Sequence, residues 1–130
     1  MKRLFSSLAL LLIATGVRAE ARTTEQSAPR ERITCSIAAG LEFGVPINII
    51  LAVAEAEGGR TGQWVRNRNG SFDVGPLQFN TRYLEQLQRQ YGITAADVAA
   101  AGCYPYELAA WRLRRHMQRD QGDLWTRVAN

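Results

Sequence analysis

Glu57 is the residue of this chain best placed to do chemistry, because it ends an apolar stretch and is followed by two glycines. Ile50, Val53 and Ala54 precede it at spacings that put all three on its face of a helix. A carboxylate in apolar surroundings is poorly solvated as an anion, which raises its pKa and lets it donate a proton near neutral pH. Glu57 is therefore predicted to be a general acid.

The same stretch contains the signals for the elements that position Glu57. Pro46 suits the first turn of a helix and Gly58-Gly59 cannot favourably extend one, which predicts a helix over 46–57. Residues 60–80 are rich in turn formers and include an alternating, strand-like piece interrupted by Gly75-Pro76. This pattern predicts a hairpin or irregular flap that faces the acid.

The order of a helix, a Glu with a small residue after it, and a later Gly-x-x-Gln-x-Asn resembles the lytic transglycosylases of the soluble, lysozyme-like family. The residues that carry the resemblance are Glu57-Gly58 and Gly75-Pro76-Leu77-Gln78-Phe79-Asn80. The similarity is greatest to small secreted members that accompany type IV secretion and conjugal transfer, and it runs from about Ile33 to the last residue. This chain differs from the family pattern where Gly58 replaces a Ser, Leu77 a Met and Phe79 a smaller aliphatic residue.

The resemblance implies a mainly α, lysozyme-like helical domain with a short β-like flap, acting on peptidoglycan without a metal or cofactor. Glu57 would protonate the β-1,4 glycosidic oxygen between N-acetylmuramic acid and N-acetylglucosamine. As an anion it would then take the proton of the muramic C6 hydroxyl, giving the cyclic 1,6-anhydro product. The implied partners are glycan strands and subunits of a secretion or conjugation apparatus.

A hydrolytic muramidase is an alternative, because glycoside hydrolysis normally uses two carboxylates. Glu55 would lie on another face of the helix and is expected to be solvated or in a surface ion pair. Asp73 lies in the flap and could approach Glu57, although an Asp in such a turn more often bonds nearby backbone amides. A second alternative is a wall-binding scaffold protein with little turnover.

The expected substrate-binding residues are positions of the flap: Asn69, Ser71, Gly75, Leu77 and Gln78. Gly75 would let the backbone approach the glycan, Leu77 would form the floor of a sugar subsite, and Gln78 would offer its amide to the acetamido group or to Glu57. Ser71 or Asn69 would replace the hydroxyl missing at Gly58. The alternative for Gln78 and Asn80 is turn stabilisation and helix capping, which is favoured for Asn80.

Several other side chains have roles that their types suggest. Trp64 is expected to stack on a sugar ring, whereas Trp111 and Trp125, on helices, are predicted to be core residues. His116 has no His, Cys or Ser at a useful spacing, so it is predicted to be a surface or helix-end residue without a metal. Four arginines crowd one segment and are predicted to form a solvated helix face rather than a nucleic-acid surface: Arg112, Arg114, Arg115 and Arg119.

Residues 1–19 have the basic start, short apolar run and small residues of a signal peptide, with cleavage expected near Ala19–Ala21 and export to the periplasm. The apolar run is too short to span a bilayer, so no stable membrane insertion is expected after cleavage. Removal of the leader leaves 13 basic and 12 acidic residues, which does not favour nucleic acid as a partner. Residues 20–31 are nearly devoid of apolar side chains and are predicted to be a disordered lead-in to a domain at 32–130.

Cys35 and Cys103 are expected to form a disulfide in an oxidising compartment, the alternative being two buried free thiols. Helices are predicted over 33–43, after Asn80 to about 91, after Thr94 to Gly102, over 105–119 and from Asp123. In the family that the chain resembles, a Tyr-containing motif follows the segment that matches residues 123–130. The domain is therefore expected to be C-terminally truncated, with an apolar patch left uncovered.

Overall fold

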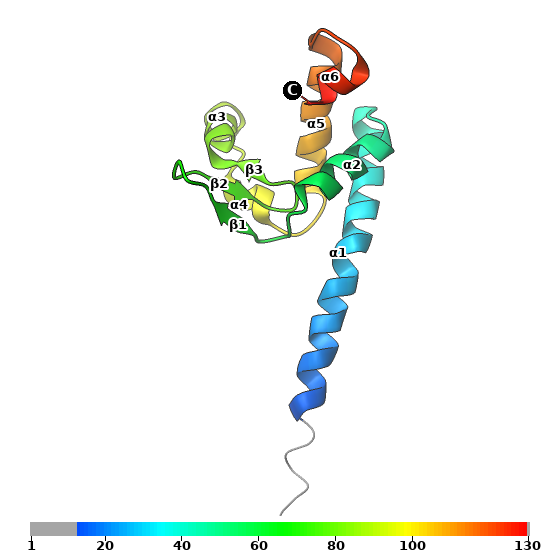
Figure 1. Ribbon diagram of the computed structural model, residues 1–130, viewed down its shortest axis with the longest axis vertical. Coiled ribbons are helices and arrows are strands. Elements are labelled where there is room, and N and C mark those ends of the chain that lie inside the picture. Colours follow the sequence, from blue (N-terminus) through cyan, green and yellow to red (C-terminus); the bar gives the residue numbers. More distant parts are fainter. Residues whose placement is uncertain (1–12, 130) are drawn as a thin grey trace, which may run out of the picture. The chain divides into compact units, whose positions relative to one another are not determined.

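The computed structural model describes the backbone of residues 13–129 and, from residue 28 onward, the side chains as well (Figure 1). The chain divides into two compact units, Met1–Arg30 and Glu31–Asn130. Residues 1–12 of the predicted leader lie outside the described residues. None of the described helices is both long and apolar enough to cross a membrane.

The first helix, α1 (Ile13–Phe43), includes residues 20–31, where the sequence predicted a disordered segment. The prediction rested on the scarcity of apolar side chains, which governs burial rather than helix formation. Glu, Ala, Gln and Arg all have high helix propensity, and the segment leads directly into the helix predicted from residue 33. The predicted end near Phe43 is confirmed, since α1 stops before Gly44 at φ 64°.

The remaining helices are α2 (Ile47–Glu57), α3 (Thr81–Tyr91), α4 (Ala95–Ala99), α5 (Tyr104–Arg119) and α6 (Leu124–Ala129). Several of their ends follow the local signals in the sequence, whereas α4 ends at Ala99, before the predicted Gly102. Asn80 caps α3 by accepting a hydrogen bond from the Arg82 backbone N–H, and Thr94 and Asp97 form a capping box at the start of α4. The described residues are mainly helical, as predicted.

The predicted flap is a three-stranded antiparallel sheet with strands in the order β1 (Trp64–Arg66), β2 (Phe72–Val74) and β3 (Phe79–Asn80). Val65 lies opposite Asp73, and Val74 lies opposite Phe79. Figure 1 shows the sheet grouped with α3 and α4, across from α2, α5 and α6. The second unit therefore has two halves, with Glu57 at the end of the helix that faces the sheet.

The core joins these halves through side chains from both of them. Ile50 and Ala54 of α2, Val74 of β2, Val98 of α4 and Ala110 of α5 are all fully buried. The predicted disulfide is confirmed: it joins Cys35 of α1 to Cys103, the residue directly before α5. A covalent bond and a shared apolar core thus fix α5, which forms one wall of the site described next.

Candidate active site

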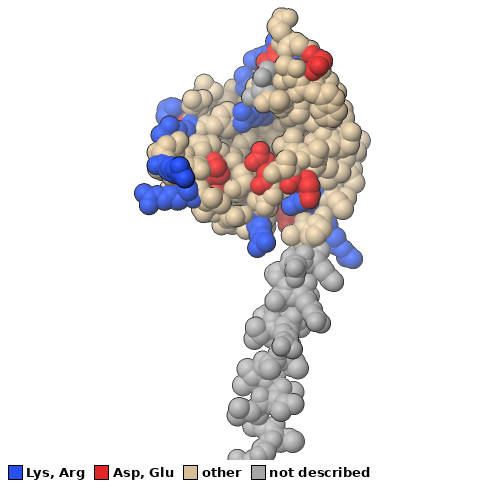
Figure 2. Space-filling model, viewed as in Figure 1, with Lys and Arg blue, Asp and Glu red and all other residues tan. Residues whose placement is uncertain are grey.

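A cleft with a volume of about 280 Å³ lies between α2, the turn before α3, and α5. Figure 2 shows acidic and basic side chains around the middle of this hollowed face. The residues that line the cleft come from elements far apart in the sequence: Val53, Glu57, Leu77, Gln78, Phe79, Asn80, Ala109, Arg112, Leu113, His116, Val128 and Ala129. The cleft therefore brings together the predicted acid and two of the predicted substrate-binding residues, Leu77 and Gln78.

Glu57 is the last residue of α2 and continues the apolar face of that helix, as predicted. Ile50 and Ala54 are buried and Val53 lines the cleft. Helix α2 ends there because Gly58 adopts a left-handed conformation at φ 60° and donates its N–H to the Ala54 carbonyl at 3.2 Å. Glu57 itself is exposed to the cleft, so it is more open to water than the sequence suggested.

The pKa of Glu57 is raised from its ordinary value, first because the surrounding protein removes part of its water, and then because the Asp73 carboxylate is near. The Arg112 guanidinium acts in the opposite direction and favours the anion. The position at the C-terminal end of α2 also disfavours a negative charge, since the helix dipole is negative there. The pKa of Glu57 is thus shifted upward, which is the direction that a proton donor near neutral pH needs.

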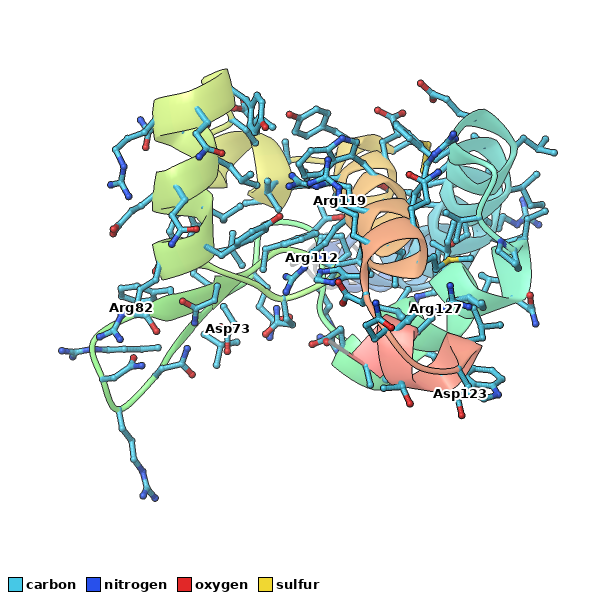
Figure 3. All side chains as sticks on the ribbon, turned by 90° about the horizontal axis from the view of Figure 1, so that it is seen from above. Asp73, Arg82, Arg112, Arg119, Asp123 and Arg127 are labelled. Carbon is cyan, nitrogen blue, oxygen red and sulfur yellow. A yellow bond between two sulfur atoms is a disulfide. The ribbon has the colours of Figure 1, made fainter. Side chains whose placement is uncertain are left out.

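Asp73 lies on β2 and its Oδ1 accepts a hydrogen bond from the Asn80 side-chain amide at 2.7 Å. The sequence favoured a bond to a backbone amide, whereas the hydrogen bond comes from a side chain on the neighbouring strand. Figure 3 shows Asp73 on the hairpin and Arg112 on α5, and the charges of both side chains act on Glu57. Asp73 is therefore held in the sheet while its charge acts on Glu57.

Gln78 has a backbone conformation that is rare for its type, at φ 47°. Its side-chain Nε2 donates to the Gly75 carbonyl at 2.8 Å, which is the turn-stabilising role that the sequence left open. A Cβ atom on Gly59 would lie 2.7 Å from this nitrogen. The absence of a side chain at Gly59, two residues after the acid, therefore lets the Gln78 amide approach the end of α2. Strain of this kind persists where the surrounding structure imposes it, and it often marks functional sites.

Gly75 has a packing role in the fold. It adopts φ 74°, and a Cβ there would lie 2.4 Å from the Val98 carbonyl oxygen of α4. Gly75 also does not line the cleft. A glycine is needed here because the turn before β3 must pass directly against α4.

Ser71 and Asn69 bond each other within the hairpin and do not line the cleft. Ser71 is 5% exposed, its Oγ donates to Asn69 Oδ1 at 2.7 Å, and the same Oγ accepts from Asn80 Nδ2 at 3.0 Å. Both side chains are thus held in a hydrogen-bond network within the hairpin. Asn80 connects this network to Asp73 and also caps α3, which confirms its predicted capping role.

Sequence reasoning missed Arg112 and His116 as cleft residues, because both were assigned to the surface. The Arg112 guanidinium lies 4.5 Å from the centre of the Tyr83 ring, and its Nε lies 3.5 Å from His116 Nε2. His116 Nδ1 in turn lies 2.8 Å from Asp120 Oδ2. The spacing of these residues, four apart on one helix, was the signal that could have found them.

Other side chains divide between confirmed and corrected predictions. Glu55 is exposed and pairs with Arg32, as expected. Trp111 is partly buried against the core, whereas Trp125 is 67% exposed and its assignment to the core was wrong, because α6 buries no side chain fully. Trp64 is exposed and contacts the edge of the Phe72 ring, outside the cleft.

Within the part of the chain that the structure describes, no group of three or more His, Cys, Asp or Glu side chains could hold a metal ion. No protein-family model matches this chain, and no curated protein matches it. Its proposed chemistry accordingly depends on the cleft residues themselves.

Proposed function

We propose that this protein is a peptidoglycan lytic transglycosylase with a lysozyme-like fold. The observation that carries the proposal is the position of Glu57 at the C-terminal end of α2, in a cleft with apolar side chains and with its pKa raised. Leu77, Phe79 and Leu113 give the cleft apolar surface for sugar rings. Polar groups that can orient a sugar are the Gln78 amide and the Arg112 guanidinium.

The reaction needs one group that is first an acid and then a base. Glu57 donates its proton to the glycosidic oxygen, and the bond from that oxygen to C1 of N-acetylmuramic acid breaks. The sugar's own acetamido group supports the positive charge at C1 until the C6 hydroxyl attacks it. The Glu57 carboxylate takes the proton of that hydroxyl, so the acid is regenerated and no water is consumed.

The two charged neighbours of Glu57 suit these two roles. Asp73 and partial desolvation favour the protonated form, which is the form that starts the reaction. Arg112 favours the carboxylate, which is the form that must accept the C6 proton. Both forms of Glu57 are therefore stabilised by a group in the site.

Hydrolysis is the second candidate, and the influence of the Asp73 carboxylate on Glu57 is the observation that favours it. A hydrolytic muramidase would use Glu57 as the acid and Asp73 as the second carboxylate. The Asn80 amide holds Asp73 in the hairpin and supports a structural role for it instead. For this reason the non-hydrolytic reaction is the one proposed.

The proposed place of action is the periplasm, after removal of the leader. The Cys35–Cys103 disulfide supports this, because structural disulfides persist in oxidising compartments. There the protein would open the wall locally for an envelope-spanning secretion or conjugation machine.

Product analysis of digested, purified peptidoglycan tests the proposal. A transglycosylase yields 1,6-anhydromuramic ends, and Asp73→Asn should retain this product at a reduced rate. If the wild-type protein instead yields reducing muramic ends, and Asp73→Asn no longer yields them, the protein is a hydrolase that uses two carboxylates. The absence of any soluble product from the wild-type protein would contradict both reactions and leave a wall-binding protein.

A further inference from the structure

A second cavity of about 290 Å³ adjoins the cleft that contains Glu57. The two cavities share Arg112 and His116 in their linings, so a ligand in one lies beside the other. This second cavity is here called the arginine pocket. Its lining residues come from α3, from α5 and from the position directly after α5: Tyr83, Trp111, Arg112, Arg115, His116, Arg119 and Asp120. The sequence had assigned its arginines to a solvated helix face.

The three arginines lie on one face of α5, because their positions differ by three and then four residues. Two of the guanidinium groups lie over aromatic rings. Arg112 lies 4.5 Å from the centre of the Tyr83 ring, and Arg115 lies 4.6 Å from the centre of the Trp111 ring. Stacking of this kind orients a guanidinium while its N–H donors still point outward around the edge.

The charges of the pocket are unbalanced. Asp120 is the acidic residue that lines it, and its carboxylate lies 2.8 Å from His116 Nδ1. The negative end of the α5 dipole favours a cation near Arg119, but it does not explain two further guanidinium groups stacked around the same cavity. An anion bound among these guanidinium groups would be attracted by each of them.

Figure 3 shows Arg112 and Arg119 extending from α5 on the side of α3. A planar, forked guanidinium matches a carboxylate with two parallel hydrogen bonds. The ligand of the Glu57 cleft is proposed to be a glycan, and in peptidoglycan each muramic acid can bear a peptide with free carboxylates. An anion in the pocket is then part of the same substrate as the sugar in the cleft.

We propose that the arginine pocket binds a carboxylate of the peptide attached to the glycan, so that the protein prefers strands with peptides that carry free carboxylates. This inference rests on the proposed function, since it takes the occupant of the neighbouring cleft to be the glycan. Arg115 and Arg119 are specificity-determining residues, because they line the pocket and not the Glu57 cleft.

The test is a binding measurement in the Glu57→Gln background, where strands are not cleaved. Soluble glycan strands with their peptides are compared with the same strands after the peptide carboxylates have been converted to amides. The unmodified strands should bind about tenfold more tightly, since a hydrogen bond between charged groups contributes more than one between neutral groups. Arg119→Gln and Arg115→Gln should each remove most of this difference without weakening the binding of the amidated strands.

Arg68→Gln is the matched control, since Arg68 is exposed in the hairpin turn and lines neither cavity. It should retain the full preference, and the thermal midpoint of each variant shows whether the fold is intact. Equal binding of native and amidated strands by the parent protein would overturn the inference and leave the proposed function standing. Binding of neither strand would overturn both, and competition by inorganic phosphate without any such preference would assign the pocket to phosphate instead.

Discussion

At the scale of single residues, Glu57 is balanced between two charged neighbours. Asp73 raises its pKa and Arg112 lowers it, while partial desolvation is the largest influence and raises it. A group that acts first as an acid and then as a base works best when its pKa lies near the operating pH. The opposing charges therefore give two separate ways of moving the pH dependence of the reaction.

Charge removal at these two positions should shift the pH profile in opposite directions. Activity falls as the pH rises through the pKa of a general acid, because the proton donor is lost. Asp73→Asn removes a charge that raises the pKa, so this alkaline limb should move to lower pH. Arg112→Gln removes a charge that lowers the pKa, so the limb should move to higher pH.

The measurement is kcat/KM on solubilised peptidoglycan as a function of pH. Glu55→Gln is the control, since Glu55 lies two residues from Glu57 but is exposed and paired with Arg32. The alkaline limb of the Glu55→Gln profile should lie at the same pH as that of the wild-type protein. Shifts of both variants in one direction, or no shift in either, would contradict the assignment of Glu57 as the titrating acid.

At the scale of elements, glycines let the end of α2, the hairpin and α4 approach one another. A Cβ on Gly59 would lie 2.2 Å from the Gly75 carbonyl oxygen, and one on Gly75 would lie 2.4 Å from the Val98 carbonyl oxygen. Real Cβ atoms do not come so close to backbone atoms, so any side chain there must push elements apart. These contacts set the distance between Glu57 and the turn that bears Gln78.

Gly75→Ala should therefore destabilise the fold and impair the site together. The added methyl group meets the Val98 backbone, and the residue must also keep a positive φ, so we expect a loss of about 3 kcal/mol in the free energy of unfolding. Gly70→Ala is the matched control at φ 81°, with no atom within 4 Å of its Cβ, and it should cost only about 1 kcal/mol. Equal losses in denaturant unfolding of the two variants would show that the contact with α4 is unimportant.

Sequence patterns predicted the elements better than the contacts between them. Helix ends depend on local signals such as Asn80 at the start of α3 and Gly58 at the end of α2, and these are readable in the chain. The meeting of Arg112 with Tyr83 depends on how α5 packs across α3, which no local pattern encodes. Trp125 was misplaced for the same reason, since a large aromatic predicts burial only where a partner surface covers it.

At the scale of the second unit, the disulfide closes a loop of 68 residues between α1 and the start of α5. Glu31 accepts a hydrogen bond from the backbone N–H of Gly102 at 2.7 Å, and Gly102 directly precedes Cys103 of the disulfide. Arg32 pairs with Glu55 and so joins α1 to α2. The segment around Cys35 is thus attached both to the helix that bears Glu57 and to the beginning of α5.

Loss of the disulfide should lower the stability of the second unit substantially. The chain-entropy model gives about 4 kcal/mol for a loop of this length, and native disulfides in small domains typically contribute about 2 to 5 kcal/mol. A fall of about 10 °C or more in the thermal midpoint is expected after mild reduction, or in Cys35→Ser with Cys103→Ser. Two titratable thiols in the unfolded, unreduced protein, or an unchanged midpoint, would contradict this role.

The most direct test of the central claim compares Glu57→Gln with Glu55→Gln in the release of soluble fragments from purified peptidoglycan. Glu57→Gln keeps the size and hydrogen bonding of the side chain but removes the proton that can be transferred. It should lose all detectable release while its thermal midpoint stays at or above that of the wild type, and Glu55→Gln should stay near wild-type activity. Wild-type release by a folded Glu57→Gln protein would contradict the assignment of Glu57 as the catalytic acid.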